Sequence, residues 1–180
     1  MTTVTISMHH ASVEVFAQFL GSLSDLIDRA AAYAEAKRID PSVLLNARLY
    51  PNMYSLTRQV GEANRHALLA CALLAGVEAP AFPDIEPDLP ELKARIATVV
   101  AFMRSLQPAA INGTETKRVI FTFRNGSTRE FSGLSLLLTF SMPQFFFHVT
   151  TAYDILRHCG VDLVKKDFLG TPSQALASAG

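Results

Sequence analysis

The feature that most constrains this chain is a set of four long segments whose apolar residues recur at steps of three and four. Such spacing gathers the apolar side chains on one face of an α-helix. The segments span about residues 8–38, 53–75, 91–106 and 143–159. Because each helix has one apolar face and the connections are mostly short, the helices can bury these faces against one another. The sequence therefore predicts an all-α fold, a four-helix bundle.

Local signals mark several ends of these helices. Asp40 and Pro41 supply an N-cap and a first-position proline for a short helix over 41–48. Gly76 and Gly160 follow the second and the last long helices, where a glycine commonly ends a helix.

One β signal interrupts the helical pattern. Runs of β-branched and aromatic residues over 117–123 and 127–131 flank Asn125-Gly126, a dipeptide that favours a tight hairpin turn. We therefore expect a small β-hairpin inserted before the last long helix and packed on the helices or on a partner chain. We expect one domain over residues 1–170 and a flexible C-terminal tail over 171–180.

Composition excludes several classes of protein. Hydrophobic residues make up 49% of the chain, and 16 basic residues balance 16 acidic ones, so no global field attracts nucleic acid or a membrane surface. The N-terminus lacks the pattern of a signal peptide, and the most apolar segment, 134–149, is too short to span a bilayer. Cys71 and Cys159 are expected to be free thiols. These features predict a cytoplasmic protein that binds neither nucleic acid nor membrane.

The histidine of the last helix is the main candidate for chemistry. On a helical wheel, His148 lies about 60° from the apolar line of that helix and can point into the bundle. His158 and Asp154 lie on the opposite face, where they would form an exposed pair. A histidine within a run of phenylalanines needs a buried polar partner.

Polar residues of the second helix could supply that partner. Gln59 and His66 lie on the flank of its apolar stripe, two turns apart, and can face the same cleft as His148 if the helices are neighbours. Glu62 lies farther round and is expected at the edge of the cleft. For His66, a hydrogen-bonded or half-exposed core histidine is the alternative interpretation.

Two motif blocks carry a family resemblance. Arg48-Leu-Tyr-Pro-Asn-Met53 precedes Thr57-Arg-Gln-Val60, and Phe147-His148-Val-Thr-Thr-Ala152-Tyr153 continues to Gly160 and Lys166-Asp-Phe-Leu-Gly170. Together they resemble an uncharacterised bacterial group of the DinB/YfiT-like superfamily, over about residues 8–170. The resemblance implies a DinB-like four-helix bundle and a homodimer.

The same resemblance implies a metal site that has changed. Members of the superfamily typically hold a divalent ion, often nickel or zinc, with one histidine from the second helix and two from the last, four residues apart. Some are thiol-dependent transferases and others are hydrolases. In this chain the positions four residues from His148 hold Gln144 and Ala152. The resemblance therefore carries over His148 as a ligand but not a full set.

Three functions remain open on this basis. The first is a small-ligand-binding or stress-related protein with a degraded metal site and no certain cofactor. The pocket of this protein would lie between the second and last helices, and its expected lining residues are Arg48, Asn52, Gln59, His148 and Tyr153. The second is a metal-dependent transferase or hydrolase in which His148, His66 and a carboxylate such as Glu62 hold one nickel or zinc ion. The third is a structural homodimer without a ligand.

Overall fold

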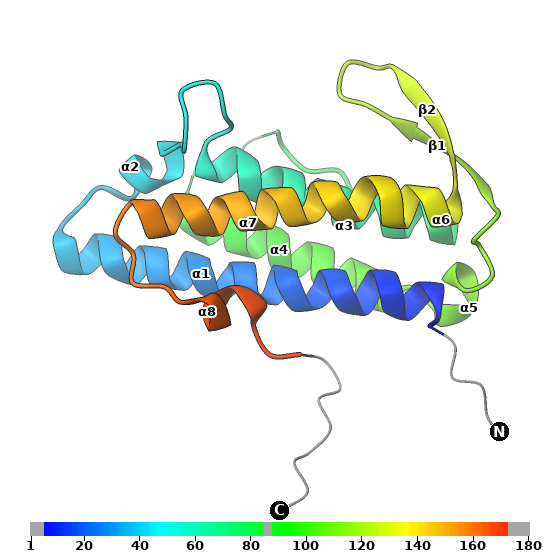
Figure 1. The fold of residues 1–180 in the computed structure, drawn as a ribbon, viewed down its shortest axis with the longest axis horizontal. Coiled ribbons are helices and arrows are strands. Elements are labelled where there is room, and N and C mark those ends of the chain that lie inside the picture. The colour runs from blue at the N-terminus through cyan, green and yellow to red at the C-terminus, as the bar shows by residue number, and fades with distance from the viewer. Residues whose placement is uncertain (1–5, 85–87, 173–180) are drawn as a thin grey trace, which may run out of the picture.

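Four long helices lie side by side in the computed structural model, which describes residues 6–84 and 88–172 (Figure 1). They are α1 (Val15–Lys37), α3 (Leu56–Ala75), α4 (Leu89–Ser105) and α7 (Met142–His158). Helix α3 packs most extensively against α7 and also contacts α4, while α1 contacts both α4 and α7. The predicted four-helix bundle is confirmed.

Shorter elements complete the fold. They are η1 (His10–Glu14, a π-helical start to α1), α2 (Pro41–Asn46), α5 (Pro108–Ile111), α6 (Gly133–Ser135), η2 (Leu136–Ser141, also π-helical) and α8 (Lys165–Leu169). Helix α8 packs against α1, where the Ser22 hydroxyl donates a 2.8 Å hydrogen bond to the carbonyl of Phe168. No helix in the described part of the chain combines the length and the apolar character that crossing a bilayer requires. From residue 173 on, the predicted flexible tail lies outside the described residues.

The helix ends follow the local signals in the sequence. The Asp40 carboxylate accepts a 2.8 Å hydrogen bond from the backbone N–H of Ser42, which caps α2. Gly76 adopts a left-handed conformation with φ 73°, and it ends α3 as predicted. Gly160, with φ 94°, follows the end of α7.

The predicted start of the last helix at about Pro143 agrees with α7, which begins at Met142, but the helical backbone extends farther back than predicted. The chain is already helical from Gly133, and α6, η2 and α7 follow one another without an interruption (Figure 1). Proline normally blocks a helix because it lacks an N–H and its ring meets the preceding turn. Here Pro143 is the second residue of α7, one residue after the π-helical turn, whose wider hydrogen-bond pattern reduces that conflict.

The hairpin consists of β1 (Arg118–Thr122) and β2 (Thr128–Ser132), paired antiparallel with Ile120 opposite Glu130. Gly126 has φ 81°, the positive value that the Asn-Gly turn requires. Val119 and Phe121 point inward and form a small apolar cluster with Leu136, which fixes the hairpin onto α3 and η2. This packing supplies the burial that an isolated hairpin lacks, and it brings the turn of the hairpin close to α3, where Arg124 reaches Glu62.

Candidate functional site

A cavity of about 380 Å³ opens between α3, α7 and the turn of the hairpin. Its lining combines buried polar groups with aromatic side chains: Tyr54, Glu62, Arg65, His66, Phe123, Arg124, Asn125, Phe140, Gln144 and His148. Helix α3 contributes one wall, α7 and η2 contribute another, and the hairpin turn closes the rim. A concave site of this size with a few convergent polar groups is typical of small-molecule sites.

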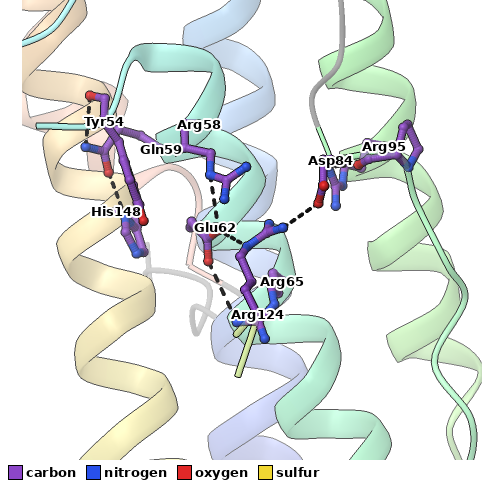
Figure 2. Close-up of polar contacts among 10 residues, drawn as sticks. Tyr54, Arg58, Gln59, Glu62, Arg65, Asp84, Arg95, Arg124 and His148 are labelled. Atoms are coloured by element: carbon purple, nitrogen blue, oxygen red, sulfur yellow. Dashed lines mark hydrogen bonds and ion pairs between the residues drawn. The ribbon is translucent and has the colours of Figure 1, made fainter. Parts of the chain in front are cut away.

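His148 reaches the cavity from α7 and is only 6% exposed. Its Nδ1 lies 2.7 Å from Oε1 of Gln59, and Nε2 of Gln59 donates to the backbone carbonyl of Tyr54 at 3.3 Å (Figure 2). Because the Gln59 amide donates through its nitrogen, its oxygen must accept the proton on Nδ1 of His148. This assigns the neutral tautomer of His148 in which Nε2 carries a free lone pair.

His66 lies on α3, 5% exposed, with its ring centroid 5.8 Å from that of His148. The ring also stacks on Phe121 of the hairpin, at 6.0 Å between centroids. Nδ1 of His66 is buried and has no hydrogen-bond partner among the described residues. A buried polar atom without a partner is rare and costly in a folded protein, so a ligand at this nitrogen would remove a penalty.

Burial keeps both histidines neutral. It lowers the pKa of His66 from 6.5 to about 3, and neighbouring His148, Arg65 and Arg124 add positive charge that acts in the same direction. Burial also lowers the pKa of His148 to about 4, although the nearby Glu62 carboxylate opposes the change. Two neutral imidazoles in one cavity are in the protonation state that metal coordination requires.

Glu62 is 5% exposed and sits among three arginines (Figure 2). Its Oε1 accepts a 2.7 Å hydrogen bond from Nε of Arg124 and lies 3.4 Å from Nε of Arg58. Its Oε2 has a looser ion pair, 3.8 Å from Nη1 of Arg65. The hydrogen bond from Arg124 holds Oε1 closely. Oε2 is the less constrained of the two oxygens and the more available ligand atom.

Glu62, His66 and His148 form a cluster in which one ligand atom of each residue lies within 4.8 Å of the others. Glu62 and His66 are four residues apart on α3 and therefore share a face, while His148 approaches from α7. Ligand atoms about 2 Å from one ion lie within this separation of one another. Two neutral imidazole donors and a carboxylate are a donor set that suits a divalent transition metal.

The expected pocket residues separate into two groups. Gln59 and His148 are joined by a hydrogen bond, and His66 lies beside them. Arg48, Asn52 and Tyr153 are not part of the cavity lining.

Those three residues have other environments. Arg48 and Asn52 are exposed, and the Arg48 guanidinium donates to the backbone carbonyl of Met53 at 2.9 Å. Tyr153 packs edge-on against Phe168 of α8, with 6.0 Å between ring centroids. Gln144, one of the two positions four residues from His148, does line the cavity, whereas Ala152 is fully buried in the core.

Several charged residues in and around the cavity were missed in the sequence analysis. Arg58 and Arg65 lie four residues before and three after Glu62, so the spacing on one helix could have indicated their ion pairs. Arg124 comes from the hairpin turn, and no local pattern connects it with Glu62. Glu62 itself, expected at the edge of the cleft, is buried.

Comparison with known proteins identifies relatives of this chain. A family model described as "Domain of unknown function (DUF1993)" matches residues 8–169. The crystal structure of a DinB family member protein from Shewanella denitrificans is 35% identical, with a TM-score of 0.82 over 93% of this chain and 94% of that chain. No curated protein matches.

Proposed function

We propose that this chain, which belongs to the DUF1993 family and shares its fold with a DinB family protein, is a metal-dependent enzyme acting on a small molecule. One divalent transition-metal ion, nickel or zinc, would be held by Glu62, His66 and His148. The observation that carries the proposal is the clustering of these three ligand atoms within 4.8 Å of one another beside a cavity.

The donor set supports this assignment. Nδ1 of His66 is buried without a hydrogen-bond partner within residues 6–84 and 88–172, and the Gln59 hydrogen bond leaves Nε2 of His148 unprotonated. A hydrogen bond from the second nitrogen of a ligand histidine to an amide or carboxylate is the usual means of orienting it. Three protein ligands leave open positions on the ion, as in catalytic rather than structural sites.

A bound ion of this kind lowers the pKa of a coordinated water or thiol and supplies a nucleophile near neutral pH, so hydrolysis and thiol transfer are the two reaction classes proposed. Other residues of the chain hold the ligand side chains in place and line the cavity. Gln59 orients His148, and Arg124 holds Oε1 of Glu62, which leaves Oε2 with only the looser ion pair to Arg65. Tyr54, Phe123 and Phe140 line the cavity with aromatic surface against which the apolar part of a substrate can pack.

The metal content of the protein tests this proposal. Protein purified without a histidine tag should carry about one equivalent of a transition metal, or take up one Co²⁺ ion per chain when the metal is supplied. Glu62→Gln, His66→Ala and His148→Ala should each weaken binding strongly, while His158→Ala, which alters an exposed histidine, should not. Stoichiometric binding that survives the three substitutions, or no binding at all, would overturn the proposal.

A metal-free ligand-binding protein is the second candidate function. One observation favours it: the Glu62 carboxylate already has ion pairs with Arg58, Arg65 and Arg124 and does not need a metal to compensate its charge. Absence of transition-metal binding, combined with ligand binding in the cavity, would favour this candidate over the enzyme.

A further inference from the structure

We propose that Arg65 and Arg124 form an anion subsite next to the Glu62/His66/His148 cluster, and that the substrate is a small carboxylate with an apolar or aromatic body. This inference names the substrate class of the proposed enzyme and so rests on the proposed function. Its physical basis is separate, because it depends on the charge balance and the shape of the cavity and does not require a bound metal ion.

The charges around the cavity do not balance. Glu62 is the one carboxylate that lines the cavity among the described residues, and it is paired with Arg58, Arg65 and Arg124. A second carboxylate, Asp84, pairs with Arg124 at 2.5 Å, but its side chain is 82% exposed and much of its charge is screened by water. A surplus of positive charge therefore remains at a partly buried site.

A divalent ion at the cluster would increase this surplus. The two positive charges of the ion would lie close to three guanidinium groups, at a site where water screens the repulsion between them only weakly. A bound anion next to the arginines would offset that repulsion. Metal and anion should therefore bind cooperatively, and by linkage each should raise the affinity for the other by the same factor.

The two arginines that line the cavity are well placed to hold a carboxylate. Arg65 is only 17% exposed, with its guanidinium 5.2 Å from the ring centroid of Phe121 and a 3.0 Å hydrogen bond from Nη2 to the carbonyl of Thr122. Arg124 uses Nε for Glu62 and Nη1 for Asp84, which occupies two of the five N–H donors of a guanidinium (Figure 2). Held in place by these contacts, both groups retain donors, and a planar guanidinium matches a carboxylate in geometry.

The aromatic lining and the volume of the cavity indicate the polarity and the size of the rest of the ligand. Tyr54, Phe123 and Phe140 present aromatic faces, and the cavity volume of about 380 Å³ lies at the lower end of the range for small-molecule sites. The arginines and the histidines line the same cavity. A small molecule can therefore place its carboxylate at Arg65 and Arg124 and its reactive group near His66 and His148.

Benzoate is a suitable probe because it combines a carboxylate with a small aromatic body. Its affinity should be measured by titration calorimetry for the metal-free and the Co²⁺-loaded protein. We expect Arg124→Gln to weaken benzoate binding about tenfold or more in both forms. The matched control is Arg118→Gln, which removes an arginine of the same hairpin that pairs with Glu130 outside the cavity. No binding to the unaltered protein, or equal affinities for Arg124→Gln and Arg118→Gln, would overturn the anion subsite.

Glu62→Gln separates this inference from the proposed function. It removes a metal ligand and also removes the internal anion that competes for Arg124, so it should abolish Co²⁺ binding and raise the benzoate affinity of the metal-free protein. An unchanged or lower benzoate affinity in this folded variant would contradict the subsite. If Co²⁺ fails to bind the unaltered protein, the metal proposal fails, and the subsite is still decided by the metal-free titrations of Arg124→Gln.

Discussion

Gln59 and His148 come from different helices and are joined by a 2.7 Å hydrogen bond between Oε1 and Nδ1, buried at the edge of the cavity. The bond selects one tautomer of His148 and directs its free nitrogen away from Gln59. Gln59 is in turn fixed by its own donation to the carbonyl of Tyr54. A chain of two hydrogen bonds thus connects the loop before α3 to the histidine that sequence analysis placed at the centre of the site.

Replacing Gln59 should change metal affinity without removing a ligand. We predict that Gln59→Leu lowers the affinity for Co²⁺ by about ten- to a hundredfold, because His148 loses the partner that orients it. Gln59→Glu should retain most of the affinity, since a carboxylate can accept the same hydrogen bond. Competition with a chelator measures both effects. Asn52→Leu, which alters an exposed amide, is the control, and an equal loss in Gln59→Leu and Gln59→Glu would contradict a positioning role.

The two buried histidines should make stability depend on pH. Their pKa values are lowered in the folded protein, to about 3 for His66 and about 4 for His148, from 6.5 when unfolded. Below pH 6.5 the unfolded state therefore binds more protons, and stability that is complete above this pH is lost as the pH falls towards 4. The expected loss is on the order of 2 kcal/mol per histidine by about pH 4.5.

Urea unfolding of the metal-free protein between pH 4.5 and 7.5 measures this dependence. His66→Phe keeps an aromatic ring beside Phe121 and removes the titrating group, so its unfolding free energy should vary less with pH than that of the unaltered protein. His158→Gln changes an exposed histidine and should follow the unaltered protein. Parallel curves for His66→Phe and the unaltered protein would show that His66 does not contribute.

Gly133 should be intolerant of a side chain. A Cβ at this position would lie 2.0 Å from the carbonyl oxygen of Thr114 and 3.0 Å from Cδ2 of Leu74, where the end of the hairpin enters α6. We predict that Gly133→Ala lowers the free energy of unfolding by at least about 2 kcal/mol, because backbone must move to relieve the contact. Thermal or urea unfolding measures the change.

Gly21→Ala is the matched comparison for Gly133→Ala. Gly21 lies inside α1, and an added Cβ there meets nothing within 4 Å. Alanine favours the helix over glycine, so this variant should gain about 0.5–1 kcal/mol. Similar changes in both variants would argue against the close approach at Gly133.

The three consecutive phenylalanines at the start of α7 lead to a prediction about assembly. Phe145 is fully buried and Phe146 packs edge-on against Phe19, but Phe147 is 55% exposed. We propose that the expected homodimer forms through the face of α7 that carries Phe147, since dimerisation would cover this ring. Light scattering after size exclusion should give a dimer for the unaltered protein and for Val43→Ser, which changes an exposed residue of α2, and a monomer for Phe147→Ser. A monomeric unaltered protein, or a dimer in all three, would contradict the proposal.

Much of the fold could be predicted because its signals are local. The apolar stripe of α3, the proline and the N-cap of α2, and the Asn-Gly turn each depend on a few neighbouring residues. The helical turns that precede α7, from Gly133 to Ser141, were missed for the same reason. Pro143 is locally a helix breaker, and only the π-helical turn before it explains why the helix continues through Gly133–His158.

The site was predictable in part. A helical wheel correctly placed His148 inward and His158 outward, and it put Gln59 and His66 on the flank of α3 that faces α7. Arg48 and Asn52 lie just before α3 in the chain, and their side chains are exposed. They belong to a loop, and the helical spacing of apolar residues does not predict the direction in which a loop leaves the helix.

Residue spacing and local preferences were enough to predict which residues face the core, where most helices end, and that a polar His148 inside an apolar run requires a buried partner. These are properties of one helix or one turn at a time, set by residue spacing and backbone preferences. Tertiary structure alone decided that Arg124 reaches Glu62 from 62 residues away and that His66 and His148 stack 5.8 Å apart. Contacts of this kind depend on how the hairpin and two helices pack together, and the charge and the shape of the cavity follow from that packing.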